Sequence, residues 1–289
     1  EALTMSKQNG FASRKKGNVA TAVIIVFLSI VAAMQIFPFY LQIVTSLQPM
    51  DMVPEVGKIY LWAEGFHIEN YIEAIERVGL LQGLLNSVIV AGGFTLLSAI
   101  VILLVGYVLG KKEFAGKKAV KFAMLLTMVA PGELLMVTNY KLVSDLGWTN
   151  SFAGLILPGI VNITGIFLVM SFMNTIPNAV LESADIDGAN EFQKLFKIVL
   201  PMTLPILATY FILTFVGQWN DYLWPMVVTN DSNLFTIQLK LKEFNPYYGG
   251  FADEVLKNAA SIFTLVPVII VYLTCQKQFV SGLSISGMK

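Results

Sequence analysis

The run Val19-Ala-Thr-Ala-Val-Ile-Ile-Val-Phe-Leu-Ser-Ile-Val-Ala-Ala-Met34 lies within a longer stretch, residues 18–49, that carries no charged side chain. A transmembrane helix needs about 20 mostly apolar residues, because the hydrocarbon core of a bilayer is about 30 Å thick. Five more stretches have this pattern, the second of them interrupted by Glu133: 84–110, 122–137, 152–172, 199–220 and 258–276. The sequence therefore predicts an all-α, polytopic membrane protein with six transmembrane helices.

The composition agrees with a membrane protein and excludes several other classes. Of the 289 residues 56% are hydrophobic and 13% are charged, about half the charged share of a soluble domain. The net charge is zero, so we expect no nucleic-acid partner. One Cys and one His leave no disulfide framework and no Cys/His zinc site. No phosphate-binding loop of the G-x-x-x-x-G-K-[ST] type occurs, so we expect this chain not to bind ATP by that route. Because one His and one Cys cannot readily form a metal or nucleophilic site, we predict no catalytic residue, metal or cofactor in this chain.

The distribution of Lys and Arg predicts the orientation in the membrane. Thirteen of these residues lie in the two tails, loop 111–121 and loop 173–198, against six in the alternate loops. Positive charge is retained in the cytoplasm, so both termini are predicted to be cytoplasmic. The predicted domains are a tail at 1–17, a six-span domain at 18–283 and a tail at 284–289. A cleaved signal peptide is disfavoured, because the first uncharged stretch exceeds a signal h-region of about 7–15 residues.

Two loops are predicted to be extracytoplasmic, the acidic loop 48–83 and loop 229–257. Within the second, residues 234–244 alternate apolar and polar side chains with period two, which is typical of a strand or a short surface element. The segment can serve only to pack against the rest of this chain, and the pattern favours this role no less than a contact with a partner.

Loop 173–198 predicts two short helices that meet at an angle before the next span. Pro177 suits a first helical turn, and Gly188 can end that helix with positive φ. Asp187 or Asn190 then offers an N-cap for a second helix. The second helix is predicted to bury one apolar face, made of Phe192, Leu195, Phe196 and Val199.

The first of these helices is predicted to dock into a protein partner. It is predicted to expose the small residues Ala179, Ser183 and Ala184 beside Leu181 and Glu182, which suits insertion into a groove of a partner. The alternative is a helix that lies on lipid, which would place Lys or Arg on the polar face. The polar side chains here are acidic instead, so anionic headgroups would repel them: Glu182, Asp185, Asp187 and Glu191.

These residues also carry a family resemblance. The pattern Glu182-Ser-Ala-x-x-Asp187-Gly188-Ala189, then six residues, then Phe196-x-Ile198-x-Leu200-Pro201, resembles the E-A-A loop of ABC-importer permeases. It is similar to the carbohydrate-uptake subfamily, in particular to the second permease of the maltose-type heterodimer. Ser183 replaces the usual Ala, a small-for-small exchange. Further similar segments are Asn70-Tyr71, Asn86-Ser87, Gly147-Trp148-Thr149-Asn150, Leu155-Ile-Leu-Pro158 and Trp219-Asn220-Asp221-Tyr-Leu-Trp224-Pro225.

The resemblance implies a non-catalytic subunit of an importer in a bacterial inner membrane. The implied partners are a homologous second permease, two ATPase subunits that hold ATP and Mg, and an extracytoplasmic solute-binding protein. The loop would be a coupling helix seated in a cleft of the ATPase, with Glu182 paired to a basic residue. The implied coupling residues are Leu181, Glu182, Ser183, Ala184, Asp187, Gly188 and Ala189. The outer loop would contact the binding protein through Phe244, Asn245 and Tyr247.

Several residues within the spans are candidates for the translocation path. Sugars are recognised by amide hydrogen bonds and by stacking on aromatic rings, whereas amides in membrane helices also join neighbouring helices. An acid inside a span faces a cavity or a partner unless it reaches water at the membrane surface. The candidates are Glu133, Asn139, Asn162, Gln218, Trp219 and Asn220. A permease for a non-sugar solute and a self-sufficient carrier or channel are the alternative functions.

Overall fold

The structure is a computed structural model that describes residues 2–55, 57–129 and 132–286. Within these ranges, the side chains of residues 2–20, 133–134, 275 and 277–286 lie outside the description. The regular elements of the described residues are all helical, which confirms the predicted all-α class. The chain divides into two compact units, 1–73 with 245–262, and 74–244 with 263–289, which are described separately.

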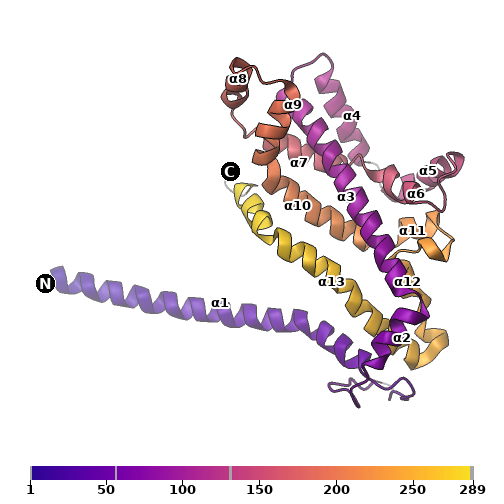
Figure 1. The fold of residues 1–289 in the computed structure, drawn as a ribbon. Helices are drawn as coiled ribbons and strands as arrows, with labels where there is room; N and C mark the ends of the chain where they lie inside the picture. The colour runs from indigo at the N-terminus through magenta and orange to yellow at the C-terminus, as the bar shows by residue number, and fades with distance from the viewer. Residues whose placement is uncertain (1, 56, 130–131, 287–289) are drawn as a thin grey trace. The chain divides into compact units, whose positions relative to one another are not determined.

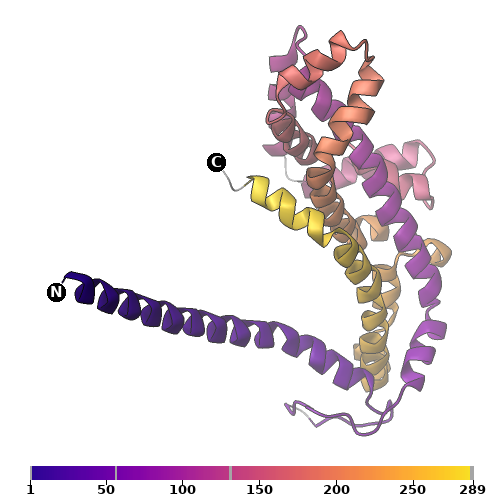
Figure 2. The same cartoon turned by 60° about the vertical axis from the view of Figure 1, so that its left-hand side comes forward.

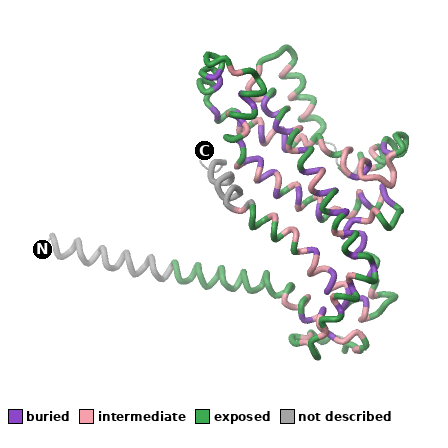
Figure 3. The backbone as a smooth tube through the Cα atoms, viewed as in Figure 1, coloured by how far each residue is buried: buried purple, intermediate pink, exposed green. Residues whose placement is uncertain are grey.

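The first unit contains α1 (Ala2–Ser46), most of α2 (Glu69–Arg77) and the beginning of α13 (Pro246–Ser286). Residues 21–39 of α1 expose their side chains along the whole run, as Figure 3 shows. The loop after α1 is fixed by buried amides. Asn70 Nδ2 donates to the carbonyl oxygens of Ser46 and Gln48 over 2.9 Å each, and Gln48 Oε1 accepts the backbone N–H of Glu64 over 2.8 Å. The amides thus satisfy backbone groups that no helix or strand would satisfy.

The second unit is built around three helices that lie side by side, α3 (Leu80–Lys111), α7 (Ile163–Met173) and α10 (Leu200–Trp219), as Figures 1 and 2 show. Glycines allow α3 to approach α7 closely. A Cβ atom on Gly106 would lie 2.7 Å from Val169 Cγ1, and one on Gly110 would lie 2.6 Å from Met173 Cβ. Gly106 and Gly110 form a G-x-x-x-G spacing, which lets membrane helices pack backbone to backbone.

Shorter helices surround this core. Val90 and Val143 form a satellite cluster with Leu155 and Val228, and Trp224 Nε1 donates to the carbonyl oxygen of Gly154 over 3.1 Å. The shorter elements are α4 (Lys117–Val129), α5 (Gly132–Asp145), α6 (Phe152–Ile156), η1 (Leu157–Gly159), α8 (Asn178–Ile186), α9 (Glu191–Gln193), η2 (Lys194–Val199), α11 (Leu223–Val228), η3 (Ser232–Leu234) and α12 (Ile237–Glu243).

Four helical stretches in the described residues are long and apolar enough to cross a membrane: Thr21–Ser46, Leu80–Lys111, Glu191–Trp219 and Pro246–Thr274. Residues Phe152–Gly159 and Ile163–Met173 make a fifth if the pair, bent by 47°, forms one broken span. The remaining predicted span, 122–137, falls on α4 and α5, with residues 130–131 between them outside the described residues. Each of these helices has at most 14 residues, too few to cross the hydrocarbon core alone.

The strand-like pattern at 234–244 belongs to η3 and α12, so the strand alternative was wrong. The physical reason is Lys240, which the alternation counts as polar. Lys240 is only 7% exposed, and its aliphatic stem lies so close to Gly83 that a Cβ on that glycine would touch it. The Lys240 Nζ lies 3.3 Å from Glu243 Oε1. The long aliphatic stem of a lysine packs like an apolar side chain while its charge stays paired. Ile237 and Lys240, three residues apart, therefore form the buried side of a helix.

Candidate functional site

The segment 177–199 forms α8, α9 and η2 and leads directly into α10. Pro177 is the N-cap of α8, one residue before the predicted position. At the other end, Ala189 N–H donates to the carbonyl oxygen of Ala184 over 2.9 Å, and Gly188 N–H donates to that of Asp185 over 3.0 Å. This is a Schellman C-cap, which needs a left-handed residue after the helix. Gly188 supplies it with φ 75°.

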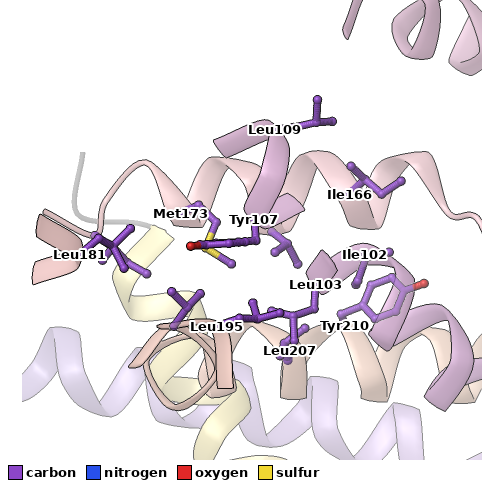
Figure 4. Packing of buried hydrophobic residues seen from close by; sticks show 13 residues of the cluster. Ile102, Leu103, Tyr107, Leu109, Ile166, Met173, Leu181, Leu195, Leu207 and Tyr210 are labelled. Atoms are coloured by element: carbon purple, nitrogen blue, oxygen red, sulfur yellow. The ribbon is translucent and has the colours of Figure 1, made fainter. Parts of the chain in front are cut away.

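The two sides of α8 differ in exposure. Leu181 and Ala184 are buried, and Leu181 belongs to the cluster that also contains Tyr107 and Met173, as Figure 4 shows. Glu182 and Ser183 are exposed. The expectation that Ala184 is presented outward was therefore wrong, because it packs against this chain on the same side as Leu181. Asp187 is the exposed C-cap residue, and Ala189 is half-buried.

The second helix of the segment starts at a capping box. Asn190 Oδ1 accepts the backbone N–H of Gln193, and Gln193 Oε1 accepts that of Asn190, over 2.9 Å each. The helix then widens into the π-helix η2 before α10. Of the four predicted apolar residues two are buried, Leu195 and Val199, whereas Phe192 is 74% exposed and Phe196 is 50% exposed.

The predicted buried face is thus confirmed for Leu195 and Val199 and wrong for Phe192 and Phe196. The reason is Lys194, which is 4% exposed and shares the inner face with Leu195. Its ammonium lies 2.6 Å from Asp185 Oδ1 and 2.6 Å from Glu191 Oε1. A lysine with two carboxylate partners can lie on an inner face without an unpaired charge. The helix therefore turns Phe192 and Phe196 outward.

These ion pairs continue to the end of α3. Glu191 Oε2 lies 2.7 Å from Lys112 Nζ and accepts the Tyr107 hydroxyl over 2.9 Å. Lys111 Nζ donates to the carbonyl oxygen of Ile176 over 2.5 Å and to Asn178 Oδ1 over 2.9 Å. The end of α3 therefore holds both helices of segment 177–199. From the sequence alone, Lys111 and Lys112 indicate only the orientation in the membrane.

A separate cavity of about 450 Å³ brings together some of the predicted path residues. Asn139 of α5 and Gln218 of α10 line it, together with Asp221, which was not among the predicted site residues. Burial raises the pKa of the Asp221 carboxyl above its usual range, and the backbone N–H of Trp224, 3.3 Å from Oδ1, opposes that shift. The other lining residues are Phe94, Gly132, Met136, Leu155, Pro158, Gly159, Leu223 and Trp224.

The remaining path candidates have structural hydrogen bonds. Trp219 is 1% exposed, stacks on Phe215 and donates through Nε1 to the carbonyl oxygen of Thr264 over 3.1 Å. Asn162 caps α7 by accepting the backbone N–H of Gly165 over 2.7 Å. Asn220 is exposed, and its Nδ2 donates to the carbonyl oxygen of Val216 over 3.0 Å. The side chain of Glu133 lies outside the described residues.

The predicted outer-loop contacts divide into one buried and two exposed residues. Phe244 is 1% exposed, and its ring lies 6.0 Å from the Arg77 guanidinium carbon. Asn245 N–H donates to Asp253 Oδ2 over 2.9 Å, and Asn245 Oδ1 accepts the N–H of Tyr247 over 3.1 Å. Tyr247 is 87% exposed. Tyr247 is thus the most accessible of the three.

The fold and segment 177–199 together define an integral membrane protein with a capped helix held just before one of its apolar helices. Residues 102–284 match the family described as "Binding-protein-dependent transport system inner membrane component". This match covers more than half of the chain and includes segment 177–199, so the chain belongs to that family. The family predicted from residues 182–201 is confirmed.

Three transport permeases are similar to this chain in sequence over most of its length. The melibiose/raffinose/stachyose import permease MelC of Bacillus subtilis (strain 168) is 32% identical, with 92% of this chain and 96% of that protein covered. The arabinooligosaccharide transport permease AraQ of the same organism is 29% identical, with 91% and 94% covered. The sn-glycerol-3-phosphate transport permease UgpE of Rhizobium meliloti (strain 1021) is 28% identical, with 86% and 90% covered.

A solved structure has the same fold. It is described as a bacterial ABC transporter involved in the import of the acidic polysaccharide alginate. The matched chain superposes with a TM-score of 0.77 at 25% identity and covers 91% of this chain and 97% of its own length. The protein is thus a multi-pass inner-membrane permease subunit of a binding-protein-dependent importer.

Proposed function

We propose that this permease forms half of the translocation pathway for a sugar or oligosaccharide. A homologous second permease forms the other half, two ATPase subunits bind Mg-ATP, and an extracytoplasmic protein delivers the solute. The names of the relatives MelC and AraQ support the solute class. An sn-glycerol-3-phosphate-like solute is the second candidate, supported by the relative UgpE. The carboxyl of Asp221 in the cavity favours the uncharged solute, since a carboxylate accepts hydrogen bonds from hydroxyl groups and repels phosphate.

The observation that carries the coupling role is the rigid attachment of an exposed helix face. Glu182 and Ser183 are exposed on α8, while the other side of that helix is buried. The Lys112–Glu191 ion pair and the hydrogen bonds of Lys111 join the segment to the end of α3, and η2 joins it to α10 without a break. A force on α8 therefore reaches two core helices, because charge-assisted hydrogen bonds are short and directional.

The proposed path includes the cavity lined by Asn139, Gln218 and Asp221. Amide and carboxyl groups supply the donors and acceptors that sugar hydroxyls require, and the Trp224 ring supplies an apolar surface. In the proposed orientation, both termini and segment 177–199 are cytoplasmic, and loops 48–83 and 229–257 are outside. The excess of Lys and Arg on one set of loops supports it.

Replacing Glu182 tests the coupling role in the complete transporter. Glu182→Ala is expected to lower uptake by about ten- to a hundredfold, the effect of one charged hydrogen bond of about 1.5–3 kcal/mol. The readouts are uptake of labelled sugar and the amount of ATPase that co-purifies. Glu76→Ala, which removes an exposed acid of α2, is the control and should leave both unchanged. Unchanged uptake with the Glu182 variant would contradict the coupling role.

A further inference from the structure

A second cavity of about 450 Å³ lies where α3 ends and α4 begins. It is lined by Glu113, Phe114, Gly116, Lys117, Lys118 and Lys121. Three of these six residues carry an ammonium group and one carries a carboxylate, so the cavity has a net positive charge. None of the roles described above uses this cavity.

Two of the three lysines remain available to an anion. Lys117 Nζ donates to Glu113 Oε1 and to the carbonyl oxygen of Lys112, over 2.8 Å each, so Glu113 and Lys117 neutralise each other. Lys118 and Lys121 have no acidic partner within 4 Å among the residues that the structure describes. The pKa of Glu113 is lowered mainly by Lys117 and further by the charges of Lys121 and Lys118. The positive potential of these lysines therefore extends into the cavity.

An apolar groove adjoins the charged cavity. It has a volume of about 320 Å³ and is lined by Leu104, Val105, Val108, Leu109, Phe114 and Val120. Phe114 lines both spaces, which makes them neighbours. Past the lysines, all exposed side chains of α4 except that of Thr127 are apolar, including Phe122 and Leu126. An anionic group beside an apolar chain is the arrangement of a phospholipid, whereas a free phosphate would use only the charged part.

We propose that this pair of spaces binds one anionic phospholipid, with its headgroup phosphate between Lys118 and Lys121 and an acyl chain along the groove of Leu104 and Val108. The inference rests on the proposed orientation, which puts loop 111–121 at the cytoplasmic leaflet. Basic pockets at this level attract anionic headgroups, and each lysine near the surface contributes about a fivefold gain in binding.

The lipid lies next to the anchor of segment 177–199. Lys117, which lines the cavity, is bonded to the carbonyl oxygen of Lys112, whose ammonium is paired with Glu191. A bound phosphate therefore restrains the same turn of the chain that holds α9. The occupied site stabilises the end of α3 in the position that fixes the segment.

The test measures lipid retained by the complete transporter in nanodiscs of phosphatidylcholine that contain a minor share of phosphatidylglycerol. Mass spectrometry of the purified complex counts the phosphatidylglycerol that stays bound. Lys118→Gln with Lys121→Gln is expected to lower retention at least about fivefold. Lys118→Arg with Lys121→Arg should keep it, which also shows that substitution at these positions permits folding. Lys58→Gln with Lys141→Gln removes the same charge elsewhere and should have no effect.

Equal retention by the first double variant and the wild type, or an equal loss in the Lys58 and Lys141 control, would overturn the proposal. Inorganic phosphate and chain-free glycerophosphoglycerol distinguish the two sources of a phosphate group. Both are expected to displace little lipid, and displacement at equimolar amounts would assign the site to a free phosphate instead. Nanodiscs expose both faces and the assay needs no transport, so its outcome is independent of the Glu182→Ala experiment on the proposed function.

Discussion

Gly188 is the residue whose backbone conformation determines the shape of segment 177–199. Its φ of 75° is costly for a residue with a Cβ atom, by about 1–2 kcal/mol. No atom lies within 4 Å of the position where that Cβ would be, so the cost arises from the backbone and not from a clash. Gly188→Val is expected to loosen the Schellman cap and to lower the sugar-stimulated ATPase activity of the reconstituted transporter.

Asparagine provides the matched control at this position, because it tolerates the left-handed region far better than valine. Gly188→Asn should retain most of the stimulated activity, and a valine substitution at Gly92, inside α3, tests a general effect of bulk. If the asparagine and valine variants at 188 lose activity equally, the backbone explanation fails.

Two buried lysines explain why the sequence pattern predicted a partly wrong buried face at η2 and a possible strand at α12. Lys194 and Lys240 are 4% and 7% exposed, and both were assigned to the polar side of a pattern. In each case a carboxylate partner, Glu191 or Glu243, lies three residues away along the chain. A hydrophobicity pattern does not include such pairing, so it misplaced part of the inner face of η2 and suggested a strand at α12.

The contact between α3 and α9 is held by Glu191, and a double-mutant cycle measures its strength. Glu191 is about half exposed and Lys112 is about one-third exposed, so their coupling energy should be about 0.5–1 kcal/mol rather than that of a buried pair. The cycle uses Glu191→Gln, Lys112→Gln and the double variant, with unfolding by SDS in mixed micelles as the measurement.

Lys141 serves as the reference for this cycle, since it is exposed on α5 and forms no ion pair with Glu191 in the described residues. A cycle of Glu191→Gln with Lys141→Gln should give a coupling energy near zero. A value for the Lys112 cycle that does not exceed the Lys141 value would show that the ion pair does not hold α9.

The packing of α3 on α7 depends on Gly106, and α3 also contains its own control. Gly106→Ala would put a Cβ 2.7 Å from Val169 Cγ1, so neighbouring atoms must move at a cost of about 1–3 kcal/mol. Gly92→Ala, in the same helix, places its Cβ with no atom within 4 Å and should gain up to about 1 kcal/mol of helix propensity. SDS unfolding of both variants should change the free energy of unfolding in opposite directions.

At the scale of whole elements, the length of the uncharged stretches predicted α1, α3, α10 and α13 well. Breaks within a span were harder to predict from the sequence. The bend of 47° between η1 and α7 and the π-helix η2 depend on tertiary packing, which no local composition reveals. The Gly188 cap and the Asn190 cap could be predicted because they depend on neighbours along the chain. The cavity at Asp221 could not, since α5, α10 and α11 bring its residues together only in the fold.

At the scale of the whole molecule, the proposed orientation puts segment 177–199 in the cytoplasm and loops 48–83 and 229–257 outside. Thirteen Lys and Arg lie on the predicted cytoplasmic side and six on the other. Ser183 and Tyr247 are both exposed and lie on either side of the single span Glu191–Trp219 in the sequence. If that helix crosses the bilayer once, these two residues must face opposite compartments.

Cysteine labelling tests this arrangement in a background where the single native cysteine is removed by Cys275→Ser. Tyr247→Cys is expected to react with a membrane-impermeant maleimide on intact spheroplasts, because its side chain is 87% exposed on the proposed outer side. Ser183→Cys should react only after the membrane is opened. The reverse pattern would contradict the orientation deduced from Lys and Arg. Labelling of both residues from outside would contradict Glu191–Trp219 as a single crossing, and with it the proposal that α8 transmits a cytoplasmic force across the membrane.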